Sequence, residues 1–228
     1  MAAHPSATFH GIPTTAADLR RDAASRPWAR DAAHAGAVCK QVVAALETEF
    51  AAQRAAGARI ACAAGCAFCC HQRVGVFVHE AGALLQHLRT ILPSDKAAAI
   101  EQRILANART IDGWTAEQHR SANLRCALLV DGRCAAYEAR PSACARYHSL
   151  SRARCEYSYE HPKDIGTPRN SRPALAELQE LGAALDSGTE AALADAGLPA
   201  AKGELHQTLR ALLEDSSAWP DLTPSPTP

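Results

Sequence analysis

Four of the nine cysteines in this chain fall within nine consecutive residues, and this crowding constrains the fold more than any other feature. They are Cys62, Cys66, Cys69 and Cys70, and His71 follows directly. A free thiol is prone to oxidation and gains little from crowding against others, so the cluster indicates metal ligands or disulfide partners. Four more cysteines follow at wider spacing: Cys126, Cys134, Cys144 and Cys155. We therefore expect a scaffold that brings the two sets together around metal.

The spacing inside the cluster bears on the kind of metal centre. Cys66 and Cys69 have the two-residue separation of a chelating knuckle, and Cys62 lies about one turn earlier. Adjacent side chains diverge, so Cys69 and Cys70 suit two metal ions, or two corners of one cluster, better than a single ion. Two four-cysteine zinc sites account for eight thiols equally well by count. The adjacent pair tilts the interpretation slightly towards an iron–sulfur cluster.

The cysteine count also bears on the compartment. Nine is an odd number, which fits poorly with a fully paired disulfide framework. The first residues show no basic start with an apolar run, and no stretch approaches the ~20 apolar residues of a membrane span. We therefore expect a cytoplasmic protein with reduced thiols and no membrane contact. The ninth cysteine, Cys39, falls inside a predicted helix and is expected to be a small buried hydrophobe.

Hydrophobic periodicity predicts a mainly α fold, in which helices surround an irregular cysteine-rich metal centre with one small β-hairpin. Helical spacing runs over about 30–56, 80–92 and 94–110, and Ser94 is the expected N-cap of the third helix. If residues 62–70 also form a helical turn, their four thiols point to one side.

The hairpin is predicted from Asp131-Gly132, a strong signal for a two-residue turn. In a strict two-residue hairpin Cys134 pairs with Leu129, which places Cys126 and Cys134 on opposite faces. Either a bulge intervenes or Cys126 lies just outside the ladder.

Composition and proline positions divide the chain into four parts. We expect a flexible N-terminal tail over 1–29, a cysteine-cluster metal-binding domain over 30–160, a C-terminal helical segment over 172–215 and a disordered tail over 216–228. Residues 161–172 are polar and carry Pro162, Gly166 and Pro168, which indicates a linker.

Charge is balanced over the whole chain but not along it. The net charge is zero, which gives no general argument for a nucleic-acid or anionic-membrane partner. Between Arg120 and Arg154, however, seven arginines face only Asp131 and Glu138. Thiolate–metal centres usually carry net negative charge, which nearby arginines would offset. A basic face for nucleic acid is the competing interpretation.

Several neighbours of the cysteines have candidate roles. His71 could be a ligand, but a histidine beside a ligand more often supports the site without binding the metal. Glu80 is expected to be an acid in the first turn of a helix, where it favours the helix dipole. Arg140 is expected to pair with Glu138 or with a thiolate.

Taken in order, these motifs resemble one family. Cys-x3-Cys-x2-Cys-Cys-His, then Cys126-Ala-Leu-Leu, Gly132-Arg-Cys134 and Arg140-Pro141-x2-Cys144 resemble the YkgJ-like cysteine-cluster family, described as a zinc- or iron-chelating domain. The resemblance runs from about Ala61 to Cys155. It implies an iron–sulfur cluster or zinc as the cofactor, and a related pattern occurs in flagellin lysine N-methylase, which is associated with an iron–sulfur cluster. Two departures concern the surroundings of the cysteines: Ala-Leu-Leu replaces the usual Pro-Phe-Leu, and the arginine expected after Cys144 stands at Arg146.

The sequence thus predicts a cytoplasmic metal-binding protein. Some of its eight clustered cysteines would hold one iron–sulfur cluster, and the others of the eight would be available for a second ion. Two alternatives stay open: a structural zinc module for interaction or nucleic-acid binding, and a redox or protein-modifying enzyme that uses the cluster. No nucleotide-binding or hydrolase motif is present, so a stand-alone enzyme is the less favoured interpretation. Metal ions are the expected partners, a protein partner is not revealed, and nucleic acid is not favoured.

Overall fold

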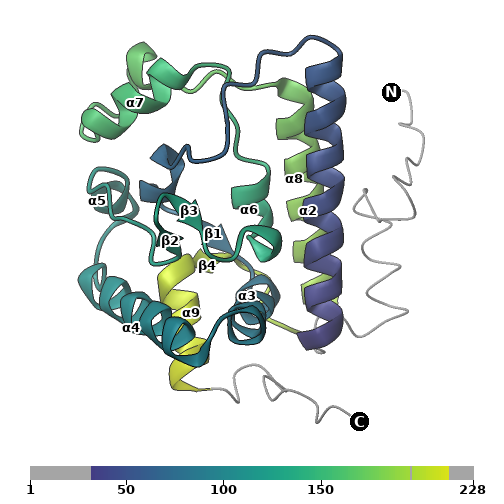
Figure 1. The fold of residues 1–228 in the computed structure, drawn as a ribbon, viewed down its shortest axis with the longest axis vertical. Helices are drawn as coiled ribbons and strands as arrows, with labels where there is room; N and C mark the ends of the chain where they lie inside the picture. Colours follow the sequence, from purple (N-terminus) through teal and green to yellow (C-terminus); the bar gives the residue numbers. More distant parts are fainter. Residues whose placement is uncertain (1–31, 196, 216–228) are drawn as a thin grey trace.

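The computed structural model describes residues 32–195 and 197–215, so the predicted tails over 1–29 and 216–228 lie outside the described residues. The described part confirms a mainly α fold with a small β-hairpin (Figure 1). The α-helices are α2 (Ala32–Ala55), α3 (Val78–Ile91), α4 (Ser94–Thr110), α5 (Ala116–Arg120), α6 (Ser142–Ala145), α7 (Arg152–Glu160), α8 (Ala176–Asp195) and α9 (Leu205–Glu214). Single 3-10 turns are η1 (Phe68–His71), η2 (Tyr137–Ala139) and η3 (Pro168–Asn170), and the strands are β1 (Gly75–Val76), β2 (Leu129–Val130), β3 (Arg133–Cys134) and β4 (Gly203–Glu204).

The hairpin has the predicted register. Leu129 pairs with Cys134 across β2 and β3. Asp131 and Gly132 both take positive φ, at 48° and 75°, as a two-residue turn of this kind requires. Cys126 lies just outside the ladder, where its carbonyl accepts a hydrogen bond from the Leu129 amide. Of the two arrangements that the sequence left open, the structure therefore has the one without a bulge.

A second ladder was not predicted. β1 pairs antiparallel with β4, with Gly75 opposite Glu204. The ladder ties the segment directly after the cysteine cluster to the segment directly before α9. It adjoins a core formed by α3, α4, α9 and the hairpin, in which the buried aliphatic residues include Val76, Leu84, Leu85, Leu88, Ile100, Ile104, Leu128, Leu205, Leu209 and Leu212.

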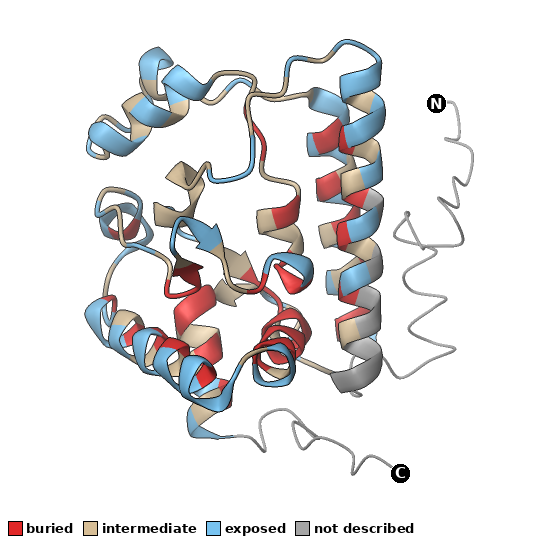
Figure 2. Ribbon diagram, viewed as in Figure 1, coloured by how far each residue is buried: buried red, intermediate tan, exposed pale blue. Residues whose placement is uncertain are grey.

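A smaller core lies between α2 and α8, which run side by side in Figure 1. Leu46 and Phe50 of α2 pack there with Leu178 and Leu185 of α8. Figure 2 shows buried positions on the inward sides of these helices and on α3 and α9, as expected when one stripe of each helix is apolar. The C-terminal helices thus contribute to both cores, and the division into units over 30–160 and 172–215 stays a prediction.

Several local expectations differ from the structure. Residues 62–70 do not form a regular helix, because Gly65 takes a φ of 82° and only the turn η1 follows. Ser94 is the first residue of α4, not its cap, because Pro93 occupies the cap position. The predicted linker contains η3, which packs against α7.

Among the helices of residues 32–195 and 197–215, none combines the length and apolar character needed to span a membrane.

Candidate metal centre

The backbone joins the two cysteine-bearing segments directly. The Cys126 amide donates to the Cys70 carbonyl at 2.7 Å, and the Ala61 amide donates to the Ser149 carbonyl at 2.8 Å. In Figure 1 the short turn η1 lies between α7 and the β2–β3 hairpin. Residues 62–71 are therefore anchored at both ends to the chain between 126 and 155.

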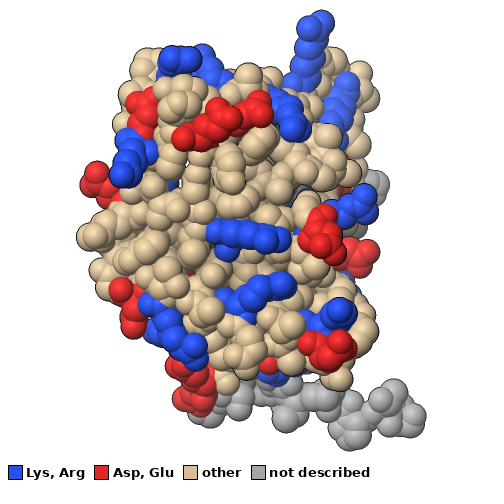
Figure 3. Space-filling model, turned by 60° about the vertical axis from the view of Figure 1, so that its left-hand side comes forward, with Lys and Arg blue, Asp and Glu red and all other residues tan. Residues whose placement is uncertain are grey.

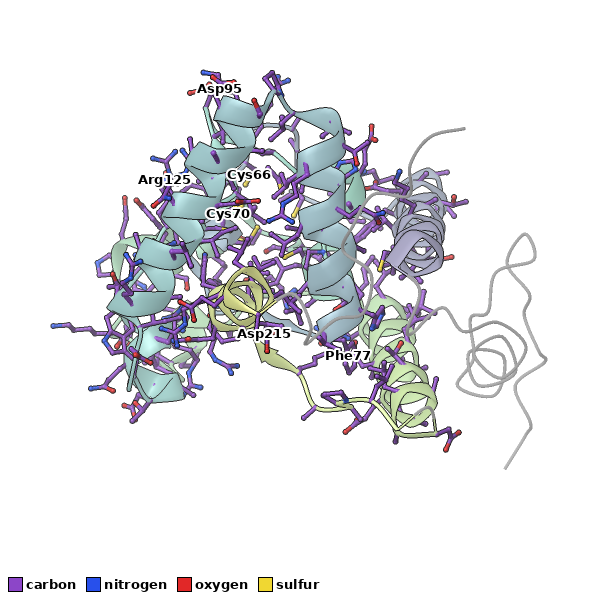
Figure 4. The ribbon with its side chains drawn as sticks, turned by 90° about the horizontal axis from the view of Figure 1, so that it is seen from below. Cys66, Cys70, Phe77, Asp95, Arg125 and Asp215 are labelled. Atoms are coloured by element: carbon purple, nitrogen blue, oxygen red, sulfur yellow. The ribbon has the colours of Figure 1, made fainter. Side chains whose placement is uncertain are left out.

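The thiols of the two segments influence one another's pKa, and Cys69 is the residue whose charge affects thiols of both segments. A negative charge on Cys69 raises the pKa of every one of four other thiols, Cys62, Cys126, Cys134 and Cys144. A hydrogen bond to Cys70 is the main cause that raises the pKa of Cys69 itself. In Figure 4 the labelled Cys66 and Cys70 lie toward the middle of the molecule, with further sulfur atoms around them in that view.

The mutual effects separate the thiols into two groups. In the inner group, burial raises the pKa of Cys144 and the charges of Cys126 and Cys134 raise it further. Burial also raises the pKa of Cys126, to about 12. In the outer group, burial raises the pKa of Cys62, with smaller contributions from Cys155 and Cys66 on the same side. The charge of Cys69 acts on thiols of both groups, and Cys69 is hydrogen-bonded to its neighbour Cys70.

Backbone amides support the charged form of three of these sulfurs. The amide of Leu128 bonds to the sulfur of Cys126, and the amide of Ala136 bonds to that of Cys134, each two residues further along. The amide of Ser149 does the same for Cys62. Each bond lowers the pKa of its thiol against the larger effect of burial. Amide donors of this kind stabilise metal-bound thiolates. Burial disfavours the charged sulfur, and a bound metal ion would have to offset that penalty.

Arg140 has two buried N–H groups without a hydrogen-bond partner among the described residues, and its charge acts on nearby thiols. It is 8% exposed, its Nη2 bonds to Glu47, and its guanidinium carbon lies 3.8 Å from the centroid of the Tyr137 ring. Its Nε and Nη1 are buried and have no hydrogen-bond partner among the described residues. Its charge lowers the pKa of Cys69 and of Cys134. The carboxylate partner is Glu47 and not the predicted Glu138, because η2 turns against α2.

The donor set fits a metal centre, although it is not preformed. All nine cysteines are free thiols, and the eight clustered ones are partly buried. As the side chains lie, no three His, Cys, Asp or Glu residues within 32–195 and 197–215 are arranged to hold an ion. Ligation requires deprotonated sulfurs and is coupled to local rearrangement, so protonated thiols need not be in ligand geometry. The unpartnered Arg140 donors and the amide–sulfur bonds are the features that fit an anionic thiolate centre.

Glu80 joins two helices, whereas the sequence predicted a role in only one. It lies in the first turn of α3, as expected, and is 5% exposed. One of its oxygens accepts from the Phe77 amide at 3.0 Å, and the other accepts from the Ser142 amide at 2.8 Å. One carboxylate therefore satisfies the amino-terminal amides of both α3 and α6, and this fixes the helical turn that carries Cys144.

His71 and Cys155 lie at the outer edge of the centre. The His71 Nδ1 is 3.1 Å from the Ala67 carbonyl oxygen, and its ring meets the edge of Tyr159, with centroids 4.8 Å apart. Tyr159 also contacts Phe68, so it packs α7, and with it Cys155, against η1. Ligation by His71 stays an open alternative. Cys39 is 7% exposed in the interior, which confirms its role as a buried hydrophobe.

Two residues near the centre gave no signal in the sequence. Asn107 and His206 both contact the backbone beside Cys126, from α4 and α9. Neither stands near a cysteine along the chain, so no motif could have identified them.

The arginines between 120 and 154 do not form a free basic face. Arg146 pairs with Asp186 at 2.6 Å, Arg125 donates to the Leu129 carbonyl at 2.9 Å, and Arg154 donates to the Pro168 carbonyl. With the buried Arg140, four of the seven bond within the chain. Figure 3, which brings forward the side of Figure 1 that holds α4, α5 and α7, shows basic side chains interleaved with acidic ones. This distribution gives little support to nucleic-acid binding.

Comparison with known proteins identifies the cysteine-bearing segment. Residues 61–165 match the family model CxxCxxCC, described as a "putative zinc- or iron-chelating domain". The match confirms the resemblance found in the sequence, and residues 61–165 are similar to the domain that this family model describes. Zinc or iron is accordingly the metal with which the domain is associated. No curated protein and no solved structure gave a match.

Proposed function

We propose that the chain is a cytoplasmic iron-binding protein in which part of the eight clustered thiolates holds one iron–sulfur cluster and the rest are available for a second ion. The ligands would be Cys62, Cys66, Cys69, Cys70, Cys126, Cys134, Cys144 and Cys155. The cytoplasmic location is proposed because all nine cysteines are free, as they are in a reducing compartment.

The position of Cys69 and Cys70 is the observation that carries this proposal. Cys69 is hydrogen-bonded to Cys70, and its charge acts on thiols of both the inner and the outer group. Because the side chains of Cys69 and Cys70 diverge, one of these two sulfurs could bind with the inner group and the other with the outer group. The eight thiols therefore divide most simply into two sets of four, each with three other cysteines and one member of the pair.

Arg140 supports the anionic character of such a centre. Two of its N–H donors are buried without a partner, which costs about 1–3 kcal/mol unless something compensates. Thiolates of a metal centre would compensate, since the guanidinium already lowers the pKa of Cys69 and of Cys134. When bound, an iron–sulfur cluster would supply one-electron redox chemistry. This chain would contribute the ligands, the buried surroundings and the compensating charge.

The experiment is purification without oxygen, followed by a visible spectrum and by iron, zinc and acid-labile sulfide analysis. The proposal predicts a brown protein with equal amounts of iron and sulfide. Cys69→Ser or Cys70→Ser should each release metal and lower the free energy of unfolding by several kcal/mol, because metal binding and folding are coupled. Cys39→Ala is the matched control, since it changes a buried cysteine outside the centre and should leave the metal content unchanged.

Other outcomes would replace the proposal. A colourless protein with two zinc ions per chain would select the structural zinc alternative. If Cys69→Ser and Cys70→Ser leave the metal content unchanged, the role assigned to the adjacent pair is wrong. A wild-type chain that takes up neither metal after anaerobic reconstitution would overturn metal binding itself.

A further inference from the structure

The backbone around Cys126 is held by side chains from two helices. The carbonyl of Arg125 accepts from Asn107 Nδ2 at 2.8 Å, and the carbonyl of Ala127 accepts from Arg103 Nε at 3.1 Å. The amide of Ala127 donates to His206 Nε2 at 3.2 Å. These three side chains belong to α4 and α9. Together with the bond from the Cys126 amide to the Cys70 carbonyl, they pair the polar backbone groups on both sides of this cysteine.

The contacts of His206 define its tautomer. Because its Nε2 accepts from the Ala127 amide, that nitrogen carries no proton. The proton is therefore on Nδ1, which lies 3.1 Å from Glu204 Oε1 and donates to it. Asn107 Nδ2 lies 3.2 Å from the same Nε2, so the amide group of Asn107 is directed at both the histidine and the Arg125 carbonyl.

Glu204 holds the histidine in place. Its other oxygen accepts from the Gln207 amide at 3.0 Å, so the carboxylate caps α9 while it orients the ring. The side chain of Glu204 is 9% exposed and that of His206 is 5% exposed. Glu204 also pairs with Gly75 across the β1–β4 ladder, close after the cysteine cluster. Burial, the cap and the ladder leave this pair little freedom to move.

We propose that His206, oriented by Glu204, is a positioning residue for the metal centre that fixes the backbone of Cys126 for ligation. The inference rests on the proposed function. It assigns to α9, which lies beyond the matched residues 61–165, a part in metal binding. Second-layer partners that orient ligands typically change metal affinity by 10–100-fold when removed. A residue that served only the general stability of the core would not change the affinity of a folded protein for metal.

The test compares metal affinity, measured by competition with a chromophoric chelator, in the full-length wild type and its variants. His206→Leu removes the acceptor for the Ala127 amide and is expected to weaken metal binding by about tenfold or more. His206→Gln places an amide oxygen near the position of Nε2 and is expected to restore most of that loss. His87→Leu is the matched control, because His87 is also a buried histidine but lies on α3. It is expected to leave the affinity unchanged.

The outcomes separate this inference from the proposed function. If the wild type binds iron or zinc and His206→Leu binds it equally well, the inference is wrong and the proposed function stands. If the wild type binds neither metal, both are wrong. Circular dichroism of each metal-free variant shows whether it has folded. Should His206→Leu fail to fold, Asn107→Ala decides the matter, because Asn107 contacts both His206 and the Arg125 carbonyl. An unchanged metal affinity in that variant would overturn the role assigned to the contacts around Cys126.

Discussion

The carboxylate of Glu80 gives the sharpest prediction about how the centre is supported. It accepts hydrogen bonds from the first turns of two helices, α3 through Phe77 and α6 through Ser142. Glu80→Gln keeps one acceptor oxygen and replaces the other by an NH2 group, which cannot accept. One of the two backbone amides then loses its acceptor, and the other keeps only a neutral one.

The magnitude follows from these contacts. A hydrogen bond to a charged group contributes about 1.5–3 kcal/mol. Glu80 is 5% exposed, and of the two donors Phe77 is buried and Ser142 is partly buried. We therefore expect Glu80→Gln to lower the free energy of unfolding of the metal-free protein by about 2 kcal/mol. For a chain of this length, that corresponds to about 4–8 °C in Tm.

Urea denaturation of the metal-free wild type and variant, followed by circular dichroism, measures this loss. Glu101→Gln is the control, because Glu101 pairs with Arg89 on the surface at 2.7 Å, where ion pairs contribute about 0–1 kcal/mol. A Glu80→Gln variant within 0.5 kcal/mol of the wild type would refute the bridging role of this carboxylate.

Three further predictions concern pH, a partly buried ion network and the arginine at the centre. Burial lowers the pKa of His79 to about 4, so only the unfolded chain gains a proton there as the pH falls from about 6.5 towards 4. Stability should be lost over that window, and His79→Gln should show a flatter decline in urea titrations. Asp186 bonds both Arg146 and Lys202, so Asp186→Asn should cost about 1 kcal/mol in the same assay, and no loss would contradict the network. Arg140→Leu should weaken metal binding in chelator competition by about tenfold, with partial recovery in Arg140→Lys, and equal affinities would contradict charge compensation.

Local features of the fold were predictable from the sequence because local chemistry determines them. Helical periodicity located α2 and α3, and Pro93 marks the end of α3. The register of the hairpin followed from the positive φ values that Asp131 and Gly132 accept. The division of the cysteines into two spaced sets likewise identified the segment that the family model matches.

Contacts between distant segments were not predictable. The partner of Arg140 is Glu47, on a helix far earlier in the chain, and nothing in the local pattern distinguishes it from the nearer Glu138. The same holds for the β1–β4 ladder and for His206, whose contact with Ala127 depends on how α9 enters the core. The helical-wheel argument for residues 62–70 was wrong for a different reason. Gly65 breaks the helix, so tertiary bonds such as that from Cys126 to Cys70 replace local periodicity.

The central claim is that sulfurs from two distant segments share metal, and X-ray absorption at the edge of the bound metal tests it most directly. The account predicts an all-sulfur first shell, with metal–sulfur distances near 2.3 Å. Loss of bound metal should follow both from Cys66→Ser in the first segment and from Cys134→Ser in the second. A shell of nitrogen and oxygen, or metal retained in full by either variant, would contradict it.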